Sequence, residues 1–322
     1  MSDTIDKLEA AVTAKDENAL IDITINHTNA ERVKMRDDYK AKFGRDLLED
    51  FEKNFKSDFK DTVVGVFKTP AEYDADLLYY AMKGVGSDKD IITEVLCFRN
   101  PKRINEIKAK FQEKYGKDLT EEIKSETSGD YQKIVLKLLE GDRQEGGQAD
   151  TQKCSGIADE LYKAGEDKLG TDEATFIKYF TELSPAELLL VCKEYHKKYK
   201  KNMVDVISSE FDGNVKKLLT VILYSMFSPS EYFAEQIMYS VRGAGTDDAK
   251  LIRCIISRYS IDMKKVKKYY KKLYNKELLD EVKGDVSGSY GKILESLINK
   301  HCLLYTSPSP RDATLSRMPS SA

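Results

Sequence analysis

A fourfold internal repeat constrains this chain more than any other feature of its sequence. The pentapeptide Tyr115-Gly116-Lys117-Asp118-Leu119 has an earlier counterpart in Phe43-Gly44-Arg45-Asp46-Leu47. Two further counterparts follow at comparable intervals, Tyr199-Lys200-Lys201-Asn202-Met203 and Tyr274-Asn275-Lys276-Glu277-Leu278. Such self-similarity at long period predicts four structural units of one kind. The repeats are placed at 3–68, 71–140, 153–227 and 231–300.

Each repeat is predicted to contain five α-helices. Apolar residues recur at helical spacing along the chain, and alternating runs of Val, Ile and Thr are few. The fold class is therefore all-α. In the second repeat the expected helices are 71–83, 88–96, 101–114, 118–126 and 129–140.

Two segments fall outside this helical pattern. Residues 141–148 form a polar, glycine-rich linker between the second and third repeats. Beyond residue 300 the pattern stops, and 301–322 carry too few apolar residues to build a core. We expect those residues to be a disordered or non-native tail.

A glycine turn, Met82 to Asp88, separates the first two helices of the second repeat. Gly84 and Gly86 can take the left-handed backbone that ends one helix and leads into the next. Ser87, with Asp90 three residues later, is predicted to cap the second helix. The carbonyl oxygens at a helix C-terminus lack partners and carry negative partial charge, so the turn is suited to bind a cation. Alone, it could equally be an ordinary connection between helices.

The turn recurs together with a distant acid. Val241 to Asp248 repeats it, with glycines at 243 and 245, and Gly165 to Glu173 is a longer variant. An acidic residue follows the last loop glycine at the same interval in each case, from 86 to 126, from 170 to 210 and from 245 to 285. The three loops in register with three acids favour cation binding over a plain helix connection.

The composition limits the kinds of function that the chain can have. The chain has 322 residues, a formal net charge of −3 and no apolar run near the roughly 18 residues of a transmembrane helix. Its first residues are too polar for a signal peptide. Five cysteines, at 97, 154, 192, 254 and 302, lack metal-ligand spacing and are read as reduced thiols. These features predict a cytoplasmic protein whose binding to any anionic partner is local or bridged by cations.

Two motifs of the second repeat carry a family resemblance. Met82-Lys83-Gly84-Val85-Gly86-Ser87-Asp88 and Lys124-Ser125-Glu126-Thr127-Ser128-Gly129-Asp130-Tyr131, within four repeats of about seventy residues, resemble an annexin. The resemblance covers 3–300. It implies a curved, all-helical disc whose convex face binds calcium and, through it, an anionic phospholipid membrane of the phosphatidylserine type. The protein would be peripheral on membranes when calcium rises.

Carried over by position, the resemblance also implies ligands and lipid contacts. The calcium ligands would be loop carbonyls plus one carboxylate in each of three repeats: Met82, Gly84, Gly86 and Glu126; Gly165, Lys168, Gly170 and Glu210; Val241, Gly243, Gly245 and Asp285. Residues at the loop tips would contact lipid: Lys83, Ser87, Leu169, Thr171, Arg242 and Thr246. Three carbonyls and a bidentate carboxylate supply about five of the six to eight oxygens that calcium prefers, so lipid phosphate or water must complete the shell.

The first repeat departs from this pattern. The interval between the first two pentapeptides pairs Gly84, Gly86 and Glu126 with Val12, Ala14 and Asn54. Both glycines and the acid are missing, so we expect 10–17 to be a simple connection between helices, without a calcium site.

The sequence gives less support to other classes of function. The three histidines, at 27, 196 and 301, form no acid–base or metal constellation, and no known catalytic motif is present, so the protein is predicted not to be an enzyme. No EF-hand loop exists. The lysines at 264–268 are interpreted as a solvated helix face rather than a nucleic-acid site. A calcium-independent helical scaffold with a cytoskeletal partner is the alternative, although it has no use for three loop–acid pairs.

Overall fold

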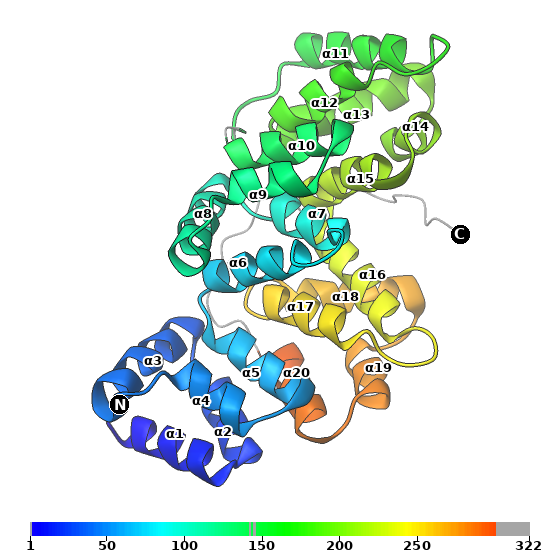
Figure 1. The fold of residues 1–322 in the computed structure, drawn as a ribbon. Helices are drawn as coiled ribbons and strands as arrows, with labels where there is room; N and C mark the ends of the chain where they lie inside the picture. The colour runs from blue at the N-terminus through cyan, green and yellow to red at the C-terminus, as the bar shows by residue number, and fades with distance from the viewer. Residues whose placement is uncertain (1, 142, 144–145, 301–322) are drawn as a thin grey trace. The chain divides into compact units, whose positions relative to one another are not determined.

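A computed structural model describes residues 2–141, 143 and 146–300. Within these residues the chain forms twenty α-helices and no strand, with five helices for each predicted repeat, the first of which begins one or two residues before the predicted start. The path of the helices can be followed in Figure 1. The all-α fold class is thus confirmed. None of these helices is both long enough and apolar enough to span a bilayer. The predicted tail, with His301 and Cys302, lies outside the described residues.

The helices group into two compact units. Unit 1 contains the described residues up to 73 and those from 230 onward, so it unites the first and fourth repeats. The helices of the first repeat are α1 (Ser2–Ala14), α2 (Glu17–Asn26), α3 (Asn29–Phe43), α4 (Leu47–Asn54) and α5 (Ser57–Phe67). Those of the fourth are α16 (Pro229–Val241), α17 (Asp248–Arg258), α18 (Met263–Tyr274), α19 (Leu278–Asp285) and α20 (Gly288–Asn299).

Unit 2 runs from Asp74 to Pro229 and holds the second and third repeats. The helices of the second repeat are α6 (Pro70–Ala81), α7 (Lys89–Cys97), α8 (Pro101–Tyr115), α9 (Leu119–Glu126) and α10 (Gly129–Glu140). Those of the third are α11 (Thr151–Ala164), α12 (Glu173–Glu182), α13 (Pro185–Tyr199), α14 (Met203–Glu210) and α15 (Gly213–Phe227). Helix α6 ends two residues earlier than predicted because the chain turns at Met82.

The pentapeptide that reveals the repeat marks the end of each third helix. Its second residue takes the left-handed conformation, with φ of +70° at Gly44, +66° at Gly116, +59° at Lys200 and +55° at Asn275. The amide of that residue closes the helix, for example by donating from Gly44 to the carbonyl of Lys40. A glycine or asparagine tolerates this conformation best. The repeat signature is therefore a helix stop followed by the N-cap of the next helix.

In unit 1 the core joins the first repeat to the fourth. Helix α5 contacts α17 and α20, and α2 contacts α20. Gly65 allows the close approach, since a Cβ there would lie 2.6 Å from Cδ1 of Ile256. The buried guanidinium of Arg32 adds a polar link by donating to the hydroxyl of Tyr259 and, at 3.1 Å, to the carbonyl of Val66.

In unit 2 the second and third repeats share a core in the same way. Helix α10 contacts α12 and α15, and α7 contacts α15. The side chains in this core are apolar and fully buried, including Ile134, Val135, Phe176, Phe180 and Ile222. Burial of such residues is the main source of stability and fixes where the helix ends lie.

Candidate metal sites

The same hydrogen bond closes each loop between the first and second helices. In the second repeat the amide of Asp88 donates to the carbonyl of Ala81 at 2.7 Å, across seven residues. In the fourth, Asp247 donates to Ser240 at 2.8 Å, again across seven. In the third, Asp172 donates to Ala164 at 2.7 Å, across eight. The loops of the second and fourth repeats thus have one length, and that of the third is one residue longer.

Glycines with positive φ shape the three loops. Gly84 and Gly86 have φ of +111° and +83°, and Gly243 and Gly245 have +121° and +102°. Gly170 in the third loop has φ of +80°. This backbone is strained for residues with a Cβ, which explains why each turn carries glycine.

The aspartate at the end of each loop, and not the hydroxyl residue before it, caps the second helix. Asp88 is the N-cap of α7, and its carboxylate accepts from the amides of Asp90 and Ile91 at 3.0 and 3.1 Å. The predicted Ser87–Asp90 capping box is therefore wrong. The Ser87 hydroxyl is turned elsewhere, because the aspartate one position later already satisfies the free amides.

That hydroxyl ties the loop to the distant acid in three repeats. Ser87 Oγ donates to the backbone carbonyl of Glu126 at 3.1 Å. Thr171 Oγ1 donates to Glu210 Oε2 at 2.6 Å, and Thr246 Oγ1 donates to Asp285 Oδ2. Each bond spans 39 residues. The fold thus brings together the loop and the acid that the sequence places far apart (Figure 1).

In the third repeat the backbone of the loop lies directly against the carboxylate. A Cβ built on Gly165 would lie 3.0 Å from Cδ of Glu210 and 3.2 Å from its Oε2. The carbonyl of Gly165 accepts from the amide of Lys168 at 3.2 Å, and a carbonyl retains a second lone pair for another partner. A larger residue at 165 would press on this carboxylate and displace it.

Each acid is the last residue of an eight-residue helix. Glu126 ends α9, Glu210 ends α14 and Asp285 ends α19. A helix C-terminus carries partial negative charge, so a carboxylate there is unfavourable unless a cation compensates it. The first helix of the repeat ends at the same loop, which adds a second negative helix terminus. The local field therefore favours a cation between the loop and the acid.

A second acid beside the third loop escaped the sequence analysis. Glu166 is nearly buried and accepts from the hydroxyl of Tyr195 at 2.7 Å, and Lys201 pairs with its other oxygen. Burial, together with the bond to Glu166, raises the pKa of Tyr195 well above its usual value. Because two donors already occupy its carboxylate, Glu166 acts in positioning the loop.

The first repeat differs from the others in loop length as well as composition. The amide of Asp16 donates to the carbonyl of Ala11 at 2.8 Å, across only five residues. The buried Leu8 and Val12 of α1 correspond to the buried Leu78 and Met82 of the second repeat. The cap Asp16 is the fourth residue after Val12, whereas the cap Asp88 is the sixth after Met82.

The counterpart of Met82 is therefore Val12, and two residues are missing after it. The assignment of Val12 and Ala14 to the positions of Gly84 and Gly86 is thus corrected. Helix α1 continues to Ala14, so the link to α2 is much shorter than the predicted 10–17. Asn54, at the position of the acid, donates from Nδ2 to the carbonyl of Asp50 at 2.9 Å.

The loop tips present apolar side chains to solvent. Val85 and Leu169 have relative exposures of 109% and 104%, the highest among the large apolar residues described. Val85 was not assigned a role from the sequence, although its place between two glycines at a turn was a usable signal. Lys83 is exposed at the same loop, with Nζ 5.9 Å from the ring centre of Tyr79, and Arg242 is exposed in the fourth loop.

The donor set suits a hard cation. Among the described residues no three His, Cys, Asp or Glu side chains cluster to hold a metal. Each candidate site instead offers one carboxylate and backbone carbonyls, which are oxygen donors of the kind calcium prefers and softer metals do not.

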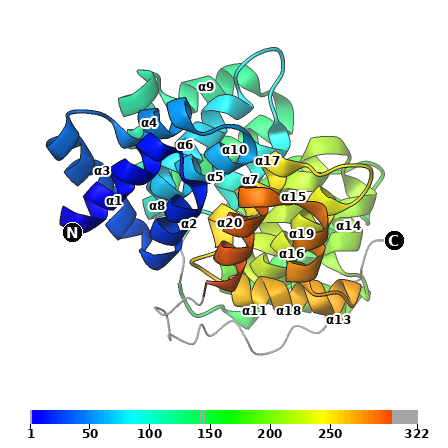
Figure 2. The same ribbon diagram turned by 90° about the horizontal axis from the view of Figure 1, so that it is seen from below.

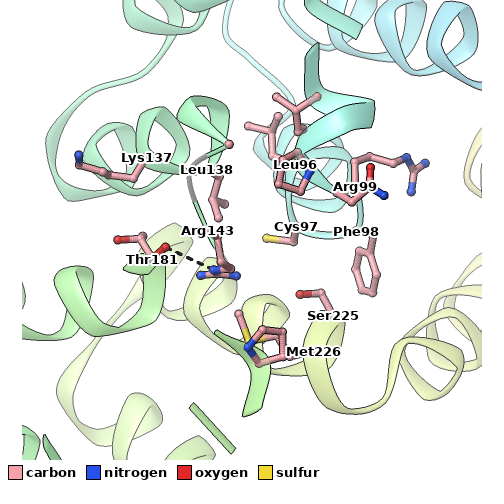
Figure 3. Close-up of a pocket in the computed structure, with 15 residues that line it drawn as sticks. Leu96, Cys97, Phe98, Arg99, Lys137, Leu138, Arg143, Thr181, Ser225 and Met226 are labelled. Atoms are coloured by element: carbon pink, nitrogen blue, oxygen red, sulfur yellow. Dashed lines mark hydrogen bonds between the residues drawn. The ribbon is translucent and has the colours of Figure 1, made fainter. Parts of the chain in front are cut away.

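A cavity of about 180 Å³ in unit 2 lies at the other end of α7 from its loop. Figure 3 shows Arg143 reaching toward Thr181, and its Nε donates to that carbonyl at 3.3 Å. Burial lowers the pKa of Arg143 to about 10 and raises the pKa of Cys97 to about 12. At neutral pH the arginine is charged and the thiol protonated. Arg143 donates to the carbonyls of Phe180 and Thr181 and thereby caps the C-terminal end of α12. Cys97, Cys154, Cys192 and Cys254 form no disulfide.

Comparison with known proteins gives one consistent result. The annexin family model matches four segments of the chain, 5–66, 73–138, 157–222 and 232–297. Annexin A4 of Homo sapiens is 37% identical over 279 residues, which cover 87% of this chain and 88% of that protein. Annexin A1 isoform p37 of Columba livia is 38% identical over 292 residues, with 90% and 85% covered.

Solved structures give the same result. The structure of annexin III is similar with a TM-score of 0.88 and 32% identity, covering 92% of this chain and 93% of that one. A calcium-bound annexin (Sm)1 is similar with a TM-score of 0.82 and 26% identity, covering 92% and 90%.

Proposed function

The chain belongs to the annexin family, whose members in general bind phospholipid in a calcium-dependent manner, and from this premise we propose three calcium sites on it. The sites are formed by the second, third and fourth repeats and hold the protein on anionic phospholipid. Their ligands are the carbonyls of Met82, Gly84 and Gly86 with Glu126, those of Gly165, Lys168 and Gly170 with Glu210, and those of Val241, Gly243 and Gly245 with Asp285.

One observation carries the proposal. In three repeats an acidic residue at a helix C-terminus is joined to a glycine loop 39 residues away by a loop hydroxyl, which bonds the carboxylate in the third and fourth repeats and the backbone carbonyl of the acid in the second. Neither helix packing nor helix capping needs an acid at that position, and the helix dipole disfavours it. A bound cation makes a carboxylate at this position favourable and so accounts for the arrangement.

The ligand count links calcium to lipid. A site with one carboxylate and three carbonyls leaves the calcium shell incomplete and the bound ion with net positive charge. A phosphate oxygen of an anionic headgroup supplies both a ligand and the missing negative charge. Calcium and membrane therefore each raise the affinity for the other, as linkage requires. This explains how a chain of net charge −3 binds an anionic surface.

The loop tips extend the contact with lipid. Lys83 and Arg242 are exposed beside the glycines and offer charge to headgroup phosphate. Val85 and Leu169 are exposed enough to enter the interfacial region. The hydroxyls of Ser87, Thr171 and Thr246 donate to the distant acid and accept from the ammonium group of a headgroup, because a hydroxyl accepts as well as donates.

Enzymatic activity is not part of this proposal, since the relatives are known as binding proteins rather than enzymes. We place the protein in the cytoplasm, where it moves to membranes when calcium rises. The thiols without disulfides are in keeping with a reducing compartment.

Co-sedimentation with phosphatidylserine vesicles tests the proposal. Full-length protein should pellet with the vesicles in calcium and remain in the supernatant in chelator at physiological salt. Vesicles of phosphatidylcholine alone are the control for surface charge. Pelleting that ignores calcium, or none at all, would favour the scaffold with a cytoskeletal partner.

A further inference from the structure

The loop of the third repeat begins with an acid where the other two candidate loops begin with a base. Glu166 is the second residue after the one whose carbonyl closes the loop, and Lys83 and Arg242 hold the same position in the other repeats. Both bases are exposed, whereas the side chain of Glu166 is only 8% exposed. A carboxylate that is nearly buried needs partners, so the start of this loop is held differently from that of the other two.

Both oxygens of the Glu166 carboxylate are bound by side chains from later in the repeat. The hydroxyl of Tyr195, in α13, donates to Oε2 at 2.7 Å, and Lys201, between α13 and α14, pairs with Oε1. Tyr195 is itself fully buried. Helix α13 contacts α11, after which the loop begins, and also α14, which ends at Glu210; these helices can be followed in Figure 1 and, from below, in Figure 2. The carboxylate therefore ties the loop to the body of the repeat.

Among the described residues the two other repeats have no such connection, because the tyrosine is replaced or lies elsewhere. Its counterpart is Phe111 in the second repeat, which has no hydroxyl, and Tyr270 in the fourth. The hydroxyl of Tyr270 lies 3.8 Å from Sδ of Met238, which belongs to α16 and not to the loop. A thioether is a weak acceptor, so this contact does not anchor the fourth loop.

The lysine also has a different partner in the third repeat. In the second and fourth repeats it pairs with a glutamate of the fourth helix, at 2.9 and 3.0 Å: Lys117–Glu122 and Lys276–Glu281. The position of these glutamates is occupied by Val206 in the third repeat. Lys201 therefore has no glutamate on the fourth helix at that position and pairs with Glu166 instead. Two exchanges of residue type thus move an ion pair from the fourth helix to the loop.

Backbone hydrogen bonds also order the third loop more than the other two. The amides of Asp167 and Lys168 donate to carbonyls at the end of α11 and the start of the loop, at 3.1 and 3.2 Å. In the second and fourth loops, which lie within the described residues, the amides of 84–87 and 243–246 donate to no backbone carbonyl. A loop that is ordered before it binds an ion loses less conformational entropy on binding.

We propose that Glu166, held by Tyr195 and Lys201, keeps the third loop in its ion-binding conformation, so that the third site takes up calcium before the other two and without lipid. Water completes the calcium shell there, because the ion does not also have to order the loop. The second and fourth sites fill at higher calcium, once a headgroup supplies the missing ligand. Glu166 is thus a positioning residue and not a ligand. This inference rests on the proposed calcium-dependent function.

Calorimetry of the full chain with calcium, in the absence of lipid, tests the order of filling. The parent should bind one ion in a first, tighter class. E126Q/D285N, which retains only the third site, should keep this class, and E210Q should lose it. The opposite result, or no binding without lipid, would overturn the proposal, although calcium-dependent sedimentation with vesicles would leave the proposed function intact. Parent-like sedimentation by E126Q/E210Q/D285N would instead contradict the proposed function itself.

Tyr195→Phe tests the anchor, in the E126Q/D285N protein. The buried Phe111 of the second repeat shows that the fold accepts phenylalanine at this position. Loss of a hydrogen bond to a charged group should weaken calcium binding at the third site about tenfold. Glu166→Gln should weaken it less, because its amide oxygen still accepts from Tyr195 although it cannot pair with Lys201.

Tyr270→Phe is the matched control, since it removes a hydroxyl from an equally buried ring at the same position of the fourth repeat. It is made in E126Q/E210Q, which retains only the fourth site, and the calcium needed for sedimentation with phosphatidylserine vesicles should not change. Thermal unfolding in chelator checks that each variant remains folded. Equal calcium affinity of the third site with and without the Tyr195 hydroxyl, or an equal loss in the control, would overturn the proposal.

Discussion

The loop between α1 and α2 and the loop between α6 and α7 occupy the same place in their repeats but differ in two ways. The closing hydrogen bond spans five residues in the first repeat and seven in the second. The last residue of the fourth helix is Asn54 in one and Glu126 in the other. The same five-helix scaffold therefore supports a loop that only connects helices and a loop that can hold a cation.

The comparison shows that the site first requires a loop of sufficient length between the first two helices. The side chain of the distant acid matters only once that loop is present. The first helix of the first repeat continues to Ala14, so Thr13 and Ala14 stay helical and do not take the positive φ of Gly84 and Gly86. Lys15, with φ of +56°, makes the whole turn. Restoring an acid alone cannot restore the carbonyl ligands, because the backbone that would present them is absent.

The largest effect is expected when the second, third and fourth repeats lose their distant acid, as the first repeat has. E126Q/E210Q/D285N removes the only anionic ligand of each site and keeps the side-chain shape. We expect the calcium needed for vesicle sedimentation to rise about a hundredfold or more, since affinity follows ligand charge. Thermal unfolding in chelator should not shift downward, because a carboxylate at a helix C-terminus is itself unfavourable. Sedimentation at the parent's calcium level would contradict the assignment.

A gain of one site should follow from repairing the first repeat in the correct register. Replacing Thr13-Ala14-Lys15 with the five residues Lys83-Gly84-Val85-Gly86-Ser87 restores the missing length between Val12 and Asp16, and Asn54→Glu restores the acid. Calorimetry with calcium in the presence of lipid should then count one more bound ion than in the parent.

Two controls sharpen this experiment. Asn54→Glu alone should add no ion, because the short loop remains. The full graft with alanine at both glycine positions should bind much more weakly, since positive φ is costly for alanine. A folded graft with an unchanged count would show that packing around the loop, rather than loop and acid, decides the site.

The smallest effect is expected at the loop hydroxyls. Ser87→Ala, Thr171→Val and Thr246→Val remove the bonds that hold the loop against the acid. One such bond is worth about 1 kcal/mol, so each change should raise the calcium requirement about fivefold. Thr13→Val in the silent loop, where the hydroxyl contacts Glu9 at 3.3 Å, is the control and should change nothing. If all four variants had the same calcium requirement, the hydroxyls would have no part in the site.

The sequence alone determined the repeat, the helical class and the pairing of three loops with three acids. These depend on local signals: apolar spacing for helices, glycine for positive φ, and a fixed interval between residues such as Gly86 and Glu126. The interval could be seen because it recurs three times. A single copy would have been an ordinary turn.

Only the tertiary structure decided the features that depend on contacts distant in sequence. It united the first and fourth repeats through Gly65 and Ile256, and it showed that the Ser87 hydroxyl meets Glu126 while Asp88 caps α7. It also revealed that two residues are missing after Val12, because the buried residues of α1 show how this helix aligns with the first helix of the second repeat. Sequence spacing measures length along the chain, whereas burial and hydrogen bonding depend on which surfaces meet, and that choice is made by packing of the whole unit.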